Sequence, residues 1–356
     1  MHTPTPLMQR LGLAYPIIQA PMAGSSTVVM AAAASNAGAL GSLALGASNA
    51  EQAREALAQL QALTEKPYNV NVFCHQPAVL DSERDRAWLA HLQPLLDEFG
   101  GRIAAPLKEI YQSFNTDTQM QQVVLEHGPA VVSFHFGLPP ADVIASLRQA
   151  GILLMATATN LDEARQIEAA GLDAIVAQGF EAGGHRGIFD QDKDEQIGTF
   201  ALLRLLVQHT RLPVIAAGGI MDGQGIAAAL QLGAQAVQMG TAFLLTRESN
   251  ANASYRALLK SPRAQHTRVT AAISGRPARG IVNRFMEEID TPAAPPIPAY
   301  PAAYDAGKQL HALAAARDVH EFGAHWAGQG AALIRDGYTV GELVHLLVQE
   351  WQAQQA

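Results

Sequence analysis

The sequence contains very little cysteine and no long apolar run. Cys74 is the only cysteine among the 356 residues, so no disulfide can form within the chain. A disulfide-free chain of this length is typical of a reducing compartment. The apolar runs are short and interrupted by glycine or polar residues, which argues against a transmembrane helix. Residues 1–10 lack a basic segment followed by an apolar one, so we expect no signal peptide, a cytoplasmic location and no membrane partner.

Charge is also scarce. Charged residues make up 16% of the chain, and the net charge is −8. Nucleic acid is therefore not an expected partner, because contact with its phosphates needs a basic face. A small anion remains compatible with this charge if the pocket that binds it is locally positive. The hydrophobic share of 49% is enough for one large α/β domain and a smaller one.

Several catalytic signatures are missing from the sequence. No His-x-x-x-His or Cys-x-x-Cys spacing offers metal ligands, so we expect no metal. Cys74 lies in no recognisable nucleophile motif, and the Gly-x-Ser-x-Gly elbow of many hydrolases is absent. These absences leave cofactor chemistry assisted by histidine as the favoured class.

Eight short apolar segments alternate with helical patterns up to about residue 250. Strands are predicted at residues 15–20, 39–45, 68–73, 130–136, 152–158, 174–177, 212–217 and 236–239. Helices are predicted between them, for example at about 140–150, 161–170, 199–209 and 223–232. This count and length favour a (β/α)8 TIM barrel. A doubly wound open sheet is the alternative, but the first strand-to-helix turn lacks the Gly-x-Gly-x-x-Gly fingerprint.

Two parts of the chain depart from this alternation. Residues 74–122 carry extra charge and two helical patterns, and we interpret them as an insertion that could contribute to a lid. Five prolines lie between Thr291 and Pro301, followed by helical patterns over about 302–319 and 340–352. We therefore predict a barrel over residues 1–255 and a smaller, mainly helical C-terminal region over 256–356 that covers the substrate.

Residues that are unusual in a core follow the predicted strands at their carboxyl ends, where TIM barrels place their active sites. They are Pro21, Met22, Asn71, His135, Gln178, Gly183, His185, Gly218, Gly219, Gln238, Met239, Gly240 and Thr241. Chance placement of all of them on one rim is improbable, so we expect one site there. For Asn71 alone, hydrogen bonding to neighbouring backbone is an equally good explanation.

Glycines in three of these segments indicate a ligand that the backbone approaches closely. Residues 174–187 (AIVAQGFEAGGHRG) run from a buried strand into a Gly-Gly-His turn, and glycine permits close approach without a Cβ clash. An ordinary loop with a solvated histidine is the alternative. Residues 216–225 and 238–244 place glycines just before helices, where barrels commonly bind a phosphate through free N–H groups. Together they predict a phosphorylated cofactor, whereas tight turns without a ligand are the alternative.

Tyr300, Tyr304 and Lys308 follow the proline-rich segment at a spacing of four residues. On a helix they would share one face. Two phenols and an ammonium on one face could line a pocket for an anionic substrate, whereas an ordinary surface helix would leave Lys308 in solvent. Pro301 and Gly307 weaken the prediction of a helix here.

Three stretches resemble the nitronate monooxygenases, formerly called 2-nitropropane dioxygenases. They are QAPMAG at 19–24, QGFEAGGHRG at 178–187 and the long stretch AAGGIMDGQGIAAALQLGAQAVQMGTAFLLTRES at 216–249. The resemblance implies a TIM barrel that binds FMN noncovalently, with a smaller domain over the flavin. FMN-dependent enoyl-acyl-carrier-protein reductases and some NAD(P)H:quinone reductases share the barrel and a related turn. Arg186, together with Tyr300, Tyr304 and Lys308, makes the chain similar to class I members.

The resemblance also implies an activity. The expected reaction is oxidation of small anionic alkyl nitronates, such as propionate 3-nitronate, by O2 to a carbonyl compound and nitrite, a nitroalkane detoxification. His185 would lie near the flavin as the catalytic group, either as a base or as a positioning group.

The remaining implied roles concern binding. The implied substrate contacts are His135, Tyr300, Tyr304 and Lys308. The implied FMN contacts are Pro21, Met22, Asn71, Gln178, Gly183, Gly218, Gly219, Gln238, Met239, Gly240 and Thr241. The alternatives are an NAD(P)H-dependent FMN reductase of quinones or enoyl thioesters, and a flavin-binding protein without turnover.

Overall fold

Eight parallel strands form the centre of the computed structural model, which describes residues 4–354. The strands are β1 (Ile17–Gln19), β2 (Gly41–Ala44), β3 (Tyr68–Phe73), β4 (Val131–His135), β5 (Leu153–Ala158), β6 (Ala174–Gln178), β8 (Val214–Ala217) and β9 (Ala236–Met239). They are hydrogen-bonded in the order β1-β9-β8-β6-β5-β4-β3-β2, and a parallel bridge between Ile18 and Leu40 joins the two ends. The sheet closes on itself, which confirms the predicted TIM barrel and excludes the open sheet.

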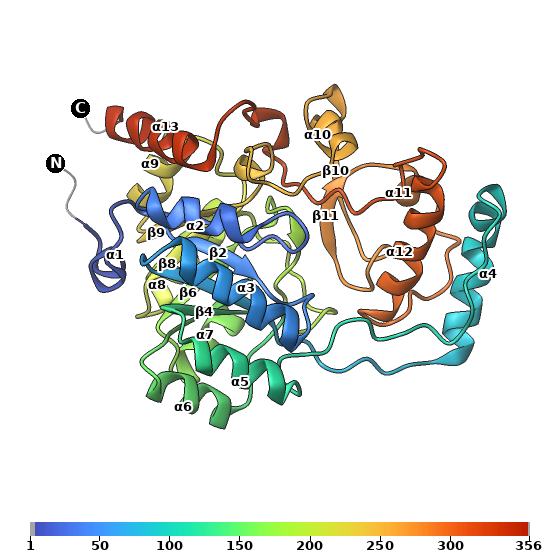
Figure 1. Ribbon diagram of the computed structural model, residues 1–356, viewed down its shortest axis with the longest axis horizontal. Helices are drawn as coiled ribbons and strands as arrows, with labels where there is room; N and C mark the ends of the chain where they lie inside the picture. The colour runs from blue at the N-terminus through green and yellow to red at the C-terminus, as the bar shows by residue number, and fades with distance from the viewer. Residues whose placement is uncertain (1–3, 355–356) are drawn as a thin grey trace.

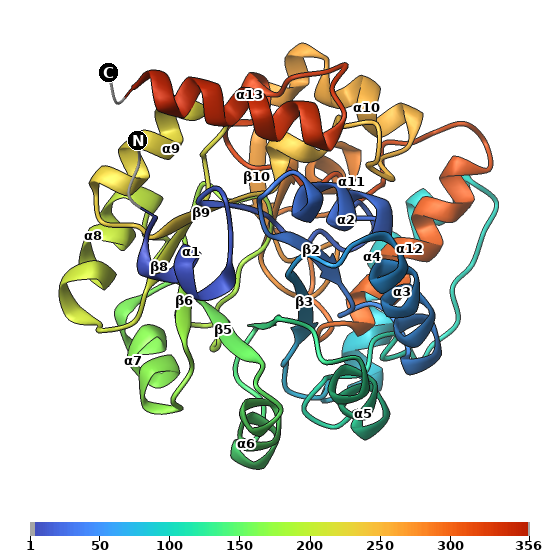
Figure 2. The same ribbon diagram turned by 60° about the vertical axis from the view of Figure 1, so that its left-hand side comes forward.

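Helices connect successive strands around the outside of the barrel (Figure 1 and Figure 2). They are α2 (Val28–Asn36), α3 (Ala50–Leu63), α5 (Thr118–His127), α6 (Ala141–Gln149), α7 (Leu161–Ala169), α8 (Thr199–His209) and α9 (Gly223–Gln231). Short polar residues begin several of them. Thr27 caps α2 and Asn49 caps α3, because each side chain accepts a hydrogen bond from the backbone N–H three residues later.

The end of the barrel where the strands begin is filled and covered. α1 (Pro6–Leu11) packs its apolar face into a buried cluster that includes Ile18 and Leu40. The hydroxyl of Thr5 donates to the carbonyl oxygen of Gln235, which holds α1 at the start of β9. Only the opposite rim, where the strands end, is left for a ligand.

A smaller second region lies beside that rim. It contains α10 (Ala253–Leu259), a 3-10 turn η2 (Pro262–Gln265), β10 (Thr267–Thr270), β11 (Ala278–Ile281), α11 (Arg284–Glu288), α12 (Ala302–Ala315) and a 3-10 turn η3 (Ala331–Leu333). α4 (Ser82–Glu98), from the predicted insertion, packs against α12 in an apolar cluster that includes Trp88, Leu92, Leu310 and Phe322. Figure 1 shows this pair of helices on the side away from α1.

The sequence pattern does not predict two features of the structure. β10 and β11 form a three-stranded antiparallel sheet with β7 (Gly184–His185), which is part of the Gly-Gly-His turn. Four-residue strands with glycine and arginine lack the apolar pattern by which strands are recognised. α13 (Val340–Ala353) packs against α9 and α2 of the barrel, although residues after 255 are expected over the mouth. The division at residue 255 stays a prediction.

Within residues 4–354, no helix combines the length and apolar character that crossing a bilayer requires.

Replacing Ile18 with alanine should test the closed interior. Ile18 is fully buried where β1 meets β2, so we expect the free energy of unfolding to fall by about 2–5 kcal/mol, because the lost atoms leave a cavity. Urea unfolding followed by far-UV circular dichroism measures this change. Val79→Ala is the control: Val79 is 82% exposed, and its effect should stay within about 0.5 kcal/mol. Equal effects of the two substitutions would contradict the closed barrel.

Candidate functional site

A cavity of about 670 Å³ lies at the carboxyl ends of the barrel strands and is bounded on its other side by the second region. Its size is typical of small-molecule sites. Every residue predicted from the sequence for this site lines the cavity: Pro21, Met22, Asn71, His135, Gln178, Gly183, His185, Gly218, Gly219, Gln238, Met239, Gly240, Thr241, Tyr300, Tyr304 and Lys308. The structure thus brings all of them together, while their individual roles stay predictions.

The Gly-Gly-His turn keeps its place because part of it is a strand. His185 pairs with Ala278 of β11, so the turn of the barrel becomes the edge of the second region's sheet. Gly184 has a φ of +73°, a left-handed conformation that glycine adopts without strain. A Cβ on Gly183 would lie 2.4 Å from the backbone nitrogen of Gly328, so no larger residue fits there. The two parts of the molecule therefore meet at this turn.

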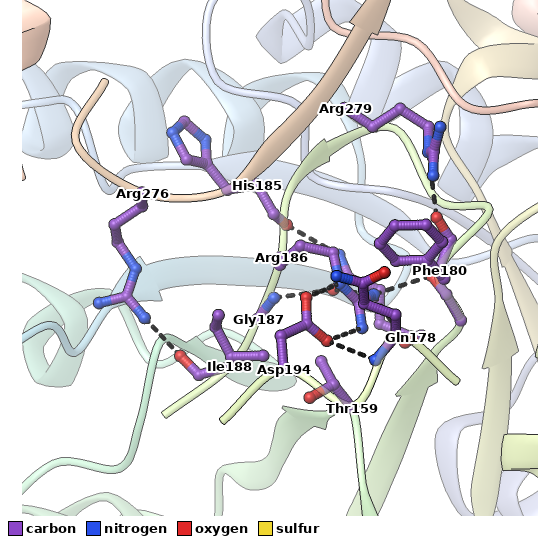
Figure 3. A network of polar contacts seen from close by, with 12 residues as sticks. Thr159, Gln178, Phe180, His185, Arg186, Gly187, Ile188, Asp194, Arg276 and Arg279 are labelled. Atoms are coloured by element: carbon purple, nitrogen blue, oxygen red, sulfur yellow. Dashed lines mark hydrogen bonds and ion pairs between the residues drawn. The ribbon is translucent and has the colours of Figure 1, made fainter. Parts of the chain in front are cut away.

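Arg186 holds the Gly-Gly-His turn against the end of β6 (Figure 3). Its side chain has no exposed surface and forms a bidentate ion pair with Asp194, with N···O distances of 2.9 and 3.0 Å. Nη1 also donates to the carbonyl oxygens of Gln178 and Gly179 at the end of β6. Burial alone would raise the pKa of Asp194, but the bond to Arg186 outweighs it and the pKa lies below its usual value. The guanidinium thus fixes the end of β6 against the following loop.

The two amide side chains predicted to contact a ligand also have partners in the protein. Gln178 Nε2 donates to the carbonyl oxygen of His185 at 2.9 Å, and Gln178 Oε1 accepts from the N–H of Gly187 at 2.7 Å. Asn71 Nδ2 donates to Ser133, to its carbonyl oxygen at 3.1 Å and to its hydroxyl at 2.9 Å. Both side chains therefore stabilise the rim as well as line the cavity.

Both ring nitrogens of His135 are engaged by the protein. Nε2 lies 3.1 Å from the carbonyl oxygen of His185, which can only accept, so Nε2 carries the proton. Nδ1 therefore accepts from the hydroxyl of Thr157 at 3.0 Å. Burial, and secondarily the charges of Arg276 and Arg186, lower the pKa of His135 to about 4. His135 thus supports the turn as a neutral imidazole and presents its ring to the cavity.

The tautomer of His185 follows from its partner. Nε2 lies 2.9 Å from the hydroxyl oxygen of Ser274. That hydroxyl has one proton, which it donates to the carbonyl oxygen of Arg276 at 3.0 Å, so His185 Nε2 is the donor. Nδ1 is then the acceptor and has no partner within residues 4–354. Burial first, then the charges of His135 and Arg276, lower the pKa of His185 to about 3. The imidazole is therefore neutral at pH 7.

Aromatic rings surround His185 on several sides. Its ring centroid lies 5.6 Å from that of Phe136, 5.7 Å from Tyr300, 6.0 Å from Tyr304 and 5.3 Å from Trp326. The helix predicted for Tyr300, Tyr304 and Lys308 begins later than expected. Tyr304 lies in the first turn of α12, whereas Tyr300 lies just before the helix and reaches the same cavity from there. This packing leaves the imidazole little freedom to rotate.

The ammonium group of Lys308 stacks on two aromatic rings. Lys308 Nζ lies 4.9 Å from the ring centroid of Tyr111 and 5.2 Å from that of Tyr304. Such contacts orient an ammonium without neutralising it. Lys308 is exposed to solvent as well, so it places a positive charge at the open edge of the cavity, and Tyr111 comes from the predicted insertion.

Free backbone donors line the part of the cavity formed by the seventh and eighth barrel loops. Gly218 and Gly219 have φ values of +117° and +73°, which turn the backbone sharply after β8. The N–H groups of Gly219 and Gly240 donate to no acceptor in the described part of the chain. Unpaired N–H groups at such loop ends fit the oxygens of a phosphate. The residues present therefore fit the phosphorylated cofactor expected from the sequence.

The sequence pattern did not indicate several residues that lie in or next to the cavity. Tyr111 and Trp326 line the cavity, whereas Phe136, Ser274 and Arg276 lie directly behind His185. The one available signal was the stretch SGRPARG at 274–280, where two arginines interrupt an otherwise small and apolar segment. Because this stretch lies far from His185 in the sequence, its pattern did not indicate that Ser274 contacts His185.

The fold and the site define a TIM-barrel protein with a cofactor-sized pocket around a neutral histidine pair. The family model described as Nitronate monooxygenase matches residues 5–350. A nitronate monooxygenase of Paraburkholderia phytofirmans is 56% identical over 345 residues, which cover 97% of this chain and 94% of that protein. One of Pseudomonas aeruginosa is 54% identical over 341 residues, covering 96% and 97%. The chain belongs to the nitronate monooxygenase family and is an oxidoreductase.

Solved structures resemble the whole chain as well. A nitroalkane oxidase from Streptomyces ansochromogenes is 40% identical and superposes with a TM-score of 0.90 over 98% of both chains. FabK from Thermotoga maritima is 29% identical, with a TM-score of 0.76 over 99% of this chain and 98% of that one. The similarity therefore extends over the barrel and the second region together.

Asp194→Asn should test the ion pair between Arg186 and Asp194 that holds the Gly-Gly-His turn. The substitution leaves the buried Arg186 without its carboxylate, so we expect the free energy of unfolding to fall by about 3–5 kcal/mol, measured by urea unfolding. Asp190→Asn is the matched control, because Asp190 pairs with Lys193 in solvent and its loss should leave the free energy of unfolding almost unchanged. A loss no larger for Asp194→Asn than for the control would show that the buried pair does not hold the turn.

Proposed function

We propose that this chain is an FMN-dependent nitronate monooxygenase that oxidises alkyl nitronates, such as propionate 3-nitronate, with O2 to a carbonyl compound and nitrite. The observation that carries the proposal is the identity of 54–56% to proteins named nitronate monooxygenase over nearly their whole length. The pocket around His185 adds a physical reason, because its polar groups suit a small anion.

FMN is the cofactor that the cavity fits. The free N–H groups of Gly219 and Gly240 would hold its phosphate. Gln178, Met22 and Asn71 line the same cavity and would contact the cofactor. When bound, FMN supplies the electron-accepting chemistry that no side chain of the protein provides.

The substrate end of the cavity offers donors to an anion. The hydroxyl of Tyr300 is buried and has no hydrogen-bond partner in the described residues. Burial raises the pKa of Tyr300 well above its usual value, so the phenol keeps its proton and can donate it in a hydrogen bond to a nitronate oxygen. Lys308 contributes a positive charge at the open edge of the cavity.

His185 is poorly suited to generate a nitronate. An imidazole whose pKa is lowered to about 3 is a weak base towards a carbon acid at neutral pH. Its Nε2–H is committed to Ser274, and its Nδ1 is an acceptor that gives no hydrogen bond to an oxygen of the anion. We therefore propose that His185 positions the substrate through the packing of its ring, and that preformed nitronates are the substrates.

The oxidation of a nitronate is the direct test. FMN-loaded protein mixed with propionate 3-nitronate under air should consume O2 and release nitrite, whereas 3-nitropropionate, whose carbon beside the nitro group is still protonated, should react at least about 100-fold more slowly, because no strong base among the described residues faces the cavity. Oxygen uptake and nitrite are measured together. His185→Asn should retain FMN and lose about tenfold or more in kcat/KM for the nitronate. Absence of both oxygen uptake and nitrite with FMN-replete protein would refute the proposed activity.

Anaerobic mixing separates the two alternatives. Rapid bleaching of the flavin by NADH or NADPH would favour a reductase of quinones or enoyl thioesters. Bound flavin that neither nitronate nor NAD(P)H reduces would favour a flavin-binding protein without turnover.

Gly219→Val should test the phosphate cradle. A branched side chain disfavours the φ of +73°, so the free N–H would turn away from the cavity and the affinity for FMN should fall by about tenfold or more. Fluorescence titration of the apoprotein with FMN measures this affinity. Gly12→Val is the matched control, because Gly12 has a φ of +65° at the end of α1, outside the cavity. Similar FMN affinity in the two variants would argue against the cradle.

A further inference from the structure

Arg276 is the buried cation of the site that no carboxylate neutralises. Its side chain is 4% exposed, and no acidic side chain within residues 4–354 lies within ion-pair distance. Nη2 donates to the carbonyl oxygen of Ile188 (Figure 3), and Nε has no hydrogen-bond partner among the residues that the structure describes. Arg186, by contrast, is neutralised by Asp194. An unpaired buried charge is costly, so its retention calls for a use.

Phe136 separates this charge from the histidines. The guanidinium carbon of Arg276 lies 4.3 Å from the centroid of the Phe136 ring. The same ring lies 4.5 Å from His135, 5.6 Å from His185 and 5.4 Å from Tyr300. An apolar ring excludes water between these groups, so the field of the cation is weakly screened there.

The backbone of Phe136 is strained in a way that supports this arrangement. Its φ is +73°, which is rare for a residue with a large side chain. Such a conformation persists only where surrounding packing holds it, and it is concentrated at functional sites. The ring held in this way contacts both the guanidinium and the imidazoles.

We propose that Arg276 is the fixed positive charge of this site, a positioning residue that acts through Phe136 to favour an anion in the cavity. The identity of that anion as a nitronate rests on the proposed function, whereas the electrostatic role does not. The cation does not line the cavity, so it acts on the ligand without touching it.

The charged and titratable groups around His185 agree with this role. Those that face it are His135 on β4, Tyr300 and Tyr304 at α12, and Arg276 before β11. Burial lowers the pKa of Arg276 to about 10, so it stays protonated at pH 7.

Acids do not cancel that charge. The carboxylate of Glu163, the acid whose charge acts on Arg276, accepts from the backbone N–H groups of Thr159 and Phe189. Burial raises the pKa of Glu163, which further weakens it as a counter-charge. The positive charge of Arg276 is therefore the dominant one beside the imidazoles.

The test compares Arg276→Met, which keeps the length but removes the charge, with Arg276→Lys, which keeps the charge. Arg276→Gln is a second neutral variant that retains a donor. Arg279→Met is the matched control, because Arg279 is equally buried but stacks on Phe180, at 4.7 Å from that ring. All variants are studied as FMN-loaded protein.

Two measurements report on the charge. Nitrate, an inert planar oxyanion, is titrated against the flavin absorbance, and its Kd should rise at least about tenfold in both neutral variants and stay within about twofold in Arg276→Lys and Arg279→Met. NMR titration of labelled histidines, assigned with His185→Asn, should show a rise in the pKa of His185 in the neutral variants alone, while burial continues to hold it below its usual value.

Unchanged nitrate affinity and unchanged titration of His185 in the neutral variants would overturn the proposal. Equal weakening in Arg279→Met would overturn it as well, because the effect would then be one of packing. Neither measurement uses turnover. A wild-type protein that oxidises no nitronate would therefore count against the proposed function alone.

Discussion

The pairing of β7 with β11 is the contact on which the arrangement of the site depends. It converts a loop that follows a barrel strand into the edge of a second sheet, so the backbone of His185 is placed by a β-ladder. Arg186 and Asp194 hold the same segment from the barrel side, and Ser274 holds the imidazole from the other. A residue fixed from both sides loses little entropy when a ligand arrives, which is the physical basis of preorganisation.

Polar groups in and around the cavity fall into two kinds. Those that build the rim are satisfied within the protein, as are both nitrogens of His135 and the amide of Gln178. Others face the cavity or lie beside it and have no partner in the described part of the chain, among them the hydroxyl of Tyr300 and the N–H of Gly219. Because buried polar groups are usually paired, the unpaired ones mark the places where a ligand belongs.

The sequence predicted the barrel and its rim because both leave local signals. Apolar strands and capped helices recur at regular intervals, and β3 and β9 lie where their patterns place them. Residues at the carboxyl ends of such strands share one rim whatever the details of packing. Ser274 and Arg276 left no comparable signal, since their partners lie about 90 residues away in β7 and its loop. The sequence did not predict β10 and β11 either, because they are strands through their pairing in the sheet with β7 and not through their own composition.

The position of α13 has a consequence for how the molecule is made. This helix fills the space between α9 and α2, where the outer ring would otherwise have a gap after β9. Residues 253–339, which include most of the second region, are thus inserted into the last repeat of the barrel. Until α13 docks, the apolar flanks of α2 and α9 are uncovered, so completion of the outer ring depends on a contact between helices far apart in the sequence, which slows folding.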